Sequence, residues 1–218
     1  MKQRIGLVLS LFILSVCVFA QESNNSGYLF DKFEKGKVIF KKGNISEGDL
    51  NYNTVRQALV FKDDKGEIMD ISNPRDVAAV NIKGRIFEYA KGDIFYERVN
   101  LDDDAVFYVQ WHNLPISKKE VGAYGTSQTT SIDNINQITG QGGNSHIGST
   151  SGAYKINNSY YLKQKGKFKR FFSSNSFADL YKGHEKEVKE YLESESIDLK
   201  KMEDVAKAVQ YCVKFLNK

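Results

Sequence analysis

Short apolar runs separated by turn residues follow one another between residues 37 and 111. They are rich in aromatic and β-branched side chains and recur about every 8–12 residues, a pattern typical of antiparallel strands. The runs of this kind are residues 38–40, 58–61, 67–71, 77–80, 85–89, 94–96 and 106–109. The pattern predicts an antiparallel β meander that is barrel-like or folded as a sandwich.

Lys-Gly pairs mark the expected turns between these runs. The pair recurs with its glycine at positions 36, 43, 66, 84, 92, 166 and 183. Glycine tolerates the positive φ of a tight turn, and the lysine beside it stays in water. The intervals are irregular and the runs between them differ, so the pairs indicate turns and not a sequence repeat.

The C-terminal part has the periodicity of helices. Ser176 and Asp179 have the spacing of a capping box, and Gly183 is expected to end or kink the helix that they begin. The last segment carries apolar side chains with a period near 3.6, which are Leu199, Met202, Val205, Val209, Cys212 and Leu216. The pattern predicts two or three C-terminal helices with Cys212 on their buried stripe.

These changes of pattern divide the chain into a signal peptide over 1–20, a β-rich body over 21–174 and helices packed on it over 175–218. Within the body, residues 125–152 are rich in Gly, Ser, Thr, Asn and Gln, contain no Lys or Arg, and predict a flexible polar loop. The expected fold class is α+β. The alternative is a separate helical hairpin tethered to the sheet, which requires exposure of Val205, Val209 and Leu216.

The first 20 residues carry the features of a secretory signal peptide. Lys2 and Arg4 precede a short apolar run, and Ala20 is a small residue at the expected cleavage point. Lipoprotein processing at Cys17 is the alternative, which the bulky Val16 disfavours. We therefore expect an exported protein that is periplasmic, associated with the outer membrane or extracellular, with no membrane span in the mature chain.

Composition and charge narrow the function classes. The 218 residues are 41% hydrophobic and 27% charged, which is enough for a packed core. Removal of Lys2 and Arg4 with the signal peptide lowers the formal net charge from +4 to +2, and this balance argues against a nucleic-acid binder. Cys212 is then the only cysteine, so no intramolecular disulfide is expected.

A search for catalytic or metal-binding residues leaves one position, His112 with Trp111 before it. The pair follows a predicted strand and lies beside a loop, where binding residues are common. The alternative is a histidine held by a neighbouring carbonyl at the rim of the sheet. His146 and His184 have no second histidine or carboxylate at ligand spacing. We expect no catalytic set, no metal and no cofactor.

A basic patch coincides with a predicted hairpin, whose strands are 154–163 and 167–172. The patch consists of Lys163, Lys165, Lys167, Lys169 and Arg170, interleaved with aromatic residues. Such a mixture contacts phosphates, acidic polysaccharide or lipid headgroups. The alternative is a hairpin whose solvated lysines protect a strand edge.

Three stretches and the helical tail carry a resemblance to known proteins. The stretches are Phe-Glu-Lys-Gly-Lys-Val-Ile-Phe-Lys-Lys-Gly at 33–43, Leu-Asn-Tyr-Asn at 50–53 and Leu-Val-Phe at 59–61. They resemble a widespread group of uncharacterised exported proteins of Bacteroidota, over nearly the whole mature chain. The resemblance implies a β-rich body, a lysine-rich helical C-terminus and a place in the envelope, and it implies no catalytic residues.

Together these features favour a non-enzymatic binding or assembly role. The expected partner is an outer-membrane or envelope protein, or an anionic surface, and not a nucleic acid. The alternative is a small-ligand carrier or hydrolase, with a site where Trp111, His112 and the loop over 125–152 converge at one end of the β body.

The cleavage site gives a direct test of export. We expect the exported protein to begin at Gln21, because Ala20 satisfies the small-residue requirement at the cut. Intact mass and N-terminal sequencing of the secreted fraction measure this start. A lipid-modified product that begins at Cys17 would contradict the expectation.

Overall fold

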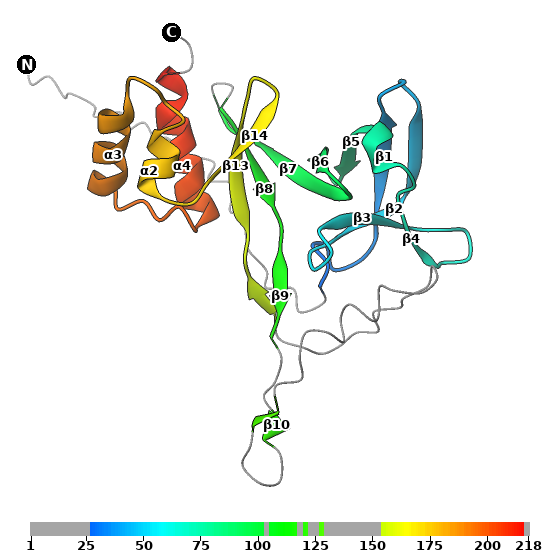
Figure 1. The fold of residues 1–218 in the computed structure, drawn as a ribbon. Coiled ribbons are helices and arrows are strands. Elements are labelled where there is room, and N and C mark those ends of the chain that lie inside the picture. Colours follow the sequence, from blue (N-terminus) through cyan, green and yellow to red (C-terminus); the bar gives the residue numbers. More distant parts are fainter. Residues whose placement is uncertain (1–26, 103–104, 117–119, 122–126, 129–153, 216–218) are drawn as a thin grey trace, which may run out of the picture.

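The computed structural model describes residues 27–102, 105–116, 120–121, 127–128 and 154–215 (Figure 1). The expected signal peptide lies outside the described residues, as does nearly all of the predicted loop over 125–152. The chain is β-rich, with one large antiparallel sheet and helices at its C-terminal end. This arrangement confirms the predicted α+β class.

Ten strands form the main sheet. They are β1 (Glu34–Phe40), β2 (Ile45–Asn53), β3 (Ala58–Lys62), β4 (Ile68–Asp70), β5 (Val77–Ile82), β6 (Arg85–Lys91), β7 (Ile94–Asn100), β8 (Val106–Gln110), β13 (Ser159–Gln164) and β14 (Lys167–Phe171). Their order across the sheet is β14-β13-β8-β7-β6-β5-β1-β2-β3-β4. Most strands that are neighbours in the sheet are also consecutive along the chain, so the sheet is mainly a meander, as the sequence predicts.

Short elements complete the β part. A 3₁₀ turn, η1 (Pro74–Asp76), precedes β5, and two small antiparallel ribbons pair β9 (Asn113–Pro115) with β12 (Tyr154–Ile156) and β10 (Glu120–Val121) with β11 (Ser127–Gln128). The hairpin predicted from residue 154 onward is thus divided. Its first three residues pair with β9, and only β13 pairs with β14.

The sheet closes on itself through strand β7. Ala58 of β3 pairs with Ile94 of β7, so β1, β2, β3, β7, β6 and β5 form a closed, barrel-like ring. The Tyr52 hydroxyl donates to the Phe95 carbonyl at 2.9 Å across the ring. Alternation of side chains along each strand fills the inside with one apolar core, which includes Val38, Leu50, Tyr52, Leu59, Val80, Ile82, Phe87 and Phe95.

Three helices cover one face of the strands beyond the ring. They are α2 (Ser174–Ala178), α3 (Glu185–Ser194) and α4 (Met202–Cys212), followed by the 3₁₀ turn η2 (Val213–Phe215). They share a second apolar core with β8, β13 and β14, in which Phe107, Val109, Tyr160, Leu162 and Phe171 meet Phe177, Val188, Leu192 and Val209.

The stripe on the last helix is buried, as its period predicts. Val205 is 0% exposed and Val209 is 2% exposed, so the alternative of a separate helical hairpin does not hold. Leu216 lies outside the described residues. Cys212 is buried on the same stripe, and burial raises the pKa of its thiol to about 12.

The first helix begins one turn earlier than the sequence predicts. Ser173 is the N-cap: its hydroxyl accepts from the Ser176 N–H, and the Ser176 hydroxyl accepts from the Ser173 N–H. Ser176 is therefore the reciprocal N3 member of the capping box and not the residue that begins the helix. The helix ends at Ala178, so Gly183 lies in the loop before α3.

Six of the seven Lys-Gly glycines have positive φ, as expected for turns. The seventh, Gly36, lies inside β1, and there the prediction of a turn is wrong. A Cβ at Gly36 would lie 2.7 Å from both the Asn81 carbonyl oxygen and Leu50 Cδ1. Glycine is required at this position by the close approach of β5 and of the ring core.

This contact gives a matched pair of variants. Gly36→Ala should lower the free energy of unfolding by about 1–3 kcal/mol, because backbone must move to admit the methyl group. Gly48 lies directly opposite on β2, and a Cβ there meets nothing within 4 Å, so Gly48→Ala should stay within about 0.5 kcal/mol. Urea unfolding measures both changes. Equal changes in the two variants would contradict the packing argument.

Candidate functional site

Trp111 lies where the two cores meet, just after β8, and it packs against both of them. Its indole N–H donates to Glu97, which also accepts two hydrogen bonds from Arg85 at 2.5 and 2.6 Å. The Arg85 guanidinium lies 5.1 Å from the Trp111 ring centroid and 5.1 Å from that of Phe30. Both the indole N–H and the ring face of Trp111 are therefore engaged in contacts between strands.

His112 is held mainly through its backbone. Its N–H donates to the Asn158 side chain at 3.0 Å, and its carbonyl accepts from the Asn157 N–H at 2.8 Å. Partial burial lowers the pKa of the imidazole, which favours its neutral form. No carboxylate of the described residues bonds to the ring, and the loop over 125–152 that the ligand-site hypothesis needs lies almost wholly outside them.

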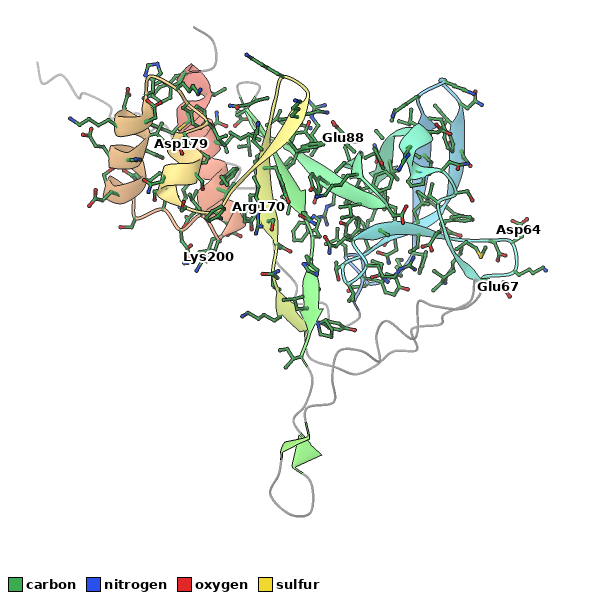
Figure 2. The ribbon with its side chains drawn as sticks, viewed as in Figure 1. Asp64, Glu67, Glu88, Arg170, Asp179 and Lys200 are labelled. Atoms are coloured by element: carbon green, nitrogen blue, oxygen red, sulfur yellow. The ribbon has the colours of Figure 1, made fainter. Side chains whose placement is uncertain are left out.

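The hairpin of β13 and β14 separates the basic residues that the sequence groups together. Gln164 pairs with Lys167 and Leu162 pairs with Lys169, so these two lysines lie on the helix side of the sheet. Lys163 and Arg170 lie on the other side, and Lys165 is at the tip of the turn. Figure 2 labels Arg170 on β14, between the helices and the ring.

An aromatic cluster lies on the face opposite the helices, and we call it the tyrosine cluster. It contains Tyr96, Tyr108, Tyr161 and Phe168, from strands β7, β8, β13 and β14. Tyr96 stacks on Tyr161 with ring centroids 4.4 Å apart, and Phe168 meets Tyr96 and Tyr108 edge-on at 5.0 and 4.9 Å. Tyr96 and Tyr108 are buried, so this face also has a small core of its own.

Lys163 lies over the rings of the tyrosine cluster. Its ammonium lies 5.1 Å from the Phe168 ring centroid, and it pairs with Glu88 of β6 at 2.7 Å. Flat strands three steps apart are separated by about 14 Å, so this ion pair requires the sheet to curl over the cluster. The Tyr108 hydroxyl also donates to Glu88 at 3.3 Å. Lys163 is therefore a packing residue of the fold, unlike the other members of the basic patch.

The remaining basic side chains lie on or beside the end strand of the sheet. We call Lys165, Lys167, Lys169 and Arg170 the basic edge. All four are exposed, and none lies within ion-pair distance of a carboxylate among the described residues. Beyond them Phe172 is 68% exposed, with the Arg170 guanidinium 6.0 Å from its ring centroid.

Sequence reasoning missed Glu88 and Glu97, the acids on which these contacts depend. Alternation along residues 85–89 places Glu88 on the face opposite Phe87, but nothing local indicates that β13 curls back to reach it. Glu97 falls in a run of aromatic and apolar residues, and a carboxylate inside such a run is the available signal of a buried ion pair.

The described residues contain no group of three side chains suited to hold a metal ion. None of their helices has the length and apolar character needed to cross a bilayer. Comparison of the chain with protein-family models, with curated proteins and with solved structures finds no match.

Burial in the tyrosine cluster predicts a response to alkaline pH. Burial, together with nearby Glu88, raises the pKa of Tyr108 from 10.0 to about 12, and burial raises that of Tyr96 as well. The tyrosines of the unfolded chain lose their protons at lower pH than those of the folded chain. Their contribution to the free energy of unfolding is therefore fully present below pH 10 and is lost as the pH rises toward about 12.

Two measurements check this response. Tyrosinate absorbance should rise late in the folded protein, and urea unfolding should show the fall in stability over the same pH range. Tyr108→Phe should make the fall shallower because it removes one of the titrating groups. Titration of every tyrosine near its ordinary pKa in the folded protein would contradict the prediction.

Proposed function

We propose that the chain is an exported envelope protein with a non-enzymatic binding or assembly role, and that its basic edge binds an anionic partner. The observation that carries the proposal is the basic edge itself: four exposed cations on and beside an end strand, with no ion-pair partner among the described residues. Five of the twelve lysines and arginines over residues 27–91 do have such partners, namely Lys35, Lys37, Arg56, Lys83 and Arg85.

The charge distribution supports an electrostatic encounter at this edge. The chain as a whole carries a formal charge of only +4, whereas the basic edge places four positive charges within six residues. Asp64 and Glu67 lie at the far end of the molecule from Arg170, on the turn between β3 and β4 (Figure 2). A locally positive strand edge attracts and orients an anionic partner, and the attraction weakens with salt.

The site near Trp111 and His112 is the competing proposal, for a small-ligand carrier or hydrolase. The indole N–H is engaged by Glu97, and the backbone groups of His112 are engaged by Asn157 and Asn158. The basic edge, by contrast, has side chains without such commitments, and this difference favours it as the binding surface.

A triple variant tests the proposal with a charge-matched control. Lys165→Gln, Lys167→Gln and Lys169→Gln together should elute from a sulfated dextran column at clearly lower salt, because three uncompensated charges are lost from one edge. Lys163 is left unchanged because its pairing with Glu88 supports the fold.

The control triple is Lys42→Gln, Lys65→Gln and Lys91→Gln, which lowers the net charge equally at two turns and at the end of β6, elsewhere on the sheet. It should elute near the wild type. Thermal melting should give unchanged stability for both triples, since the side chains are exposed. Equal elution of the two triples would reject the basic edge as the binding surface.

A further inference from the structure

One backbone edge of β14 pairs with no strand of the described part of the chain. Lys165 and Gly166 have φ of 49° and 74°, the two positive values of a two-residue type I′ turn. Gln164 and Lys167 therefore form the pair that closes the hairpin. From this pair onward, Lys167, Lys169 and Phe171 direct their N–H and C=O groups toward β13.

The residues between them direct their backbone groups away from the sheet. These are Phe168, Arg170 and Phe172, and β13 is the only strand that pairs with β14 among the described residues. The Phe172 N–H donates to the Ser176 hydroxyl at 3.0 Å, so the capping of α2 ends the free edge there. Phe168 and Arg170 remain, and the backbone N–H and C=O of each have no hydrogen-bond partner among the described residues, so they are open to another strand.

We infer that this edge receives an acidic, extended peptide of a partner protein as an added antiparallel strand. The inference rests on the proposed function and specifies its partner. Side chains of an added strand would lie beside Lys167 and Lys169 on one face and beside Arg170 on the other, so acidic residues on both faces are complementary. Main-chain hydrogen bonds to Phe168 and Arg170 would hold the added strand in register, which charge attraction alone does not do.

Two other occupants are disfavoured by charge. A second copy of β14, paired antiparallel so that Phe168 faces Arg170, would set Lys169 against Lys169 of the other copy, and like charges directly opposite are destabilising. The two long segments outside the described residues bring little acid, since residues 1–26 contain only Glu22 and residues 129–153 only Asp133, and the aspartates at 103–104 occupy a gap of just two residues. A separate acidic chain is the occupant that matches the edge.

A designed peptide gives the sharpest test. In antiparallel register, acetyl-Val-Glu-Glu-Val-Glu-amide places valines opposite Phe171 and Phe168 and glutamates opposite Arg170, Lys169 and Lys167. Its control carries N-methyl groups on the first glutamate and the second valine, which removes the N–H groups facing Arg170 and Phe168 and leaves the charge unchanged. We expect the control to bind at least about tenfold more weakly by fluorescence anisotropy with a labelled peptide.

A second pair of variants tests the edge from the protein side. Arg170→Pro removes both the charge and the outward N–H, whereas Arg170→Gln removes the charge alone. The proline variant should bind the unmethylated peptide several-fold more weakly than the glutamine variant. Far-ultraviolet circular dichroism and thermal melting establish that both variants are folded, and the methylated peptide tests the same contact on the unaltered protein.

The outcomes separate this inference from the proposed function. Equal binding of the methylated and unmethylated peptides would overturn strand addition and leave charge attraction as the mode of binding. Binding of sulfated dextran but of neither peptide would also overturn it, while the proposed function stands. Concentration-dependent dimers that Arg170→Pro abolishes would assign the edge to a second copy. If the lysine triple keeps full affinity for sulfated dextran, the proposed function itself fails.

Discussion

A carboxylate buried in a β-sheet is tolerated only when cations and hydrogen-bond donors compensate for its lost hydration. Glu97, 5% exposed, meets this requirement through Arg85 and Trp111. Arg85 comes from the closed ring, and Trp111 follows the strand that leaves it. Removal of either partner would leave a charge without compensation at the joint between the two cores, so the arrangement of the rest of the sheet depends on this contact.

Strand β7 makes that joint possible because it belongs to both parts of the structure. Phe95 lies in the ring core and Val99 in the core beneath the helices. One edge of a strand can pair with only one neighbour at each position. Ile94 therefore pairs with β3, and from Glu97 onward the same edge pairs with β8. The ring closes where the extended sheet begins, and Glu97 lies at that point.

Much of the fold is local in origin, and for that reason the sequence predicts it. Alternation and the Lys-Gly turns indicate the strands, and the 3.6-residue period indicates the buried face of α4. The contacts that define the candidate site are not local. Lys163 looks like its neighbours along the chain, yet it alone is drawn over the tyrosine cluster by Glu88, 75 positions earlier. Gly36 resembles a turn glycine until the approach of Asn81 is known.

An end strand that carries lysines can both prevent self-association of the sheet edge and bind an acidic partner strand. Exposed cations discourage two identical edges from pairing, because each copy brings the same charge. They impose no such penalty on an acidic strand, so one set of side chains disfavours self-association and favours a different partner. The pairing of Lys163 with Glu88 fixes the hairpin against the sheet before any partner arrives. Less conformational freedom is then lost on binding, which leaves more of the edge's interaction energy for affinity.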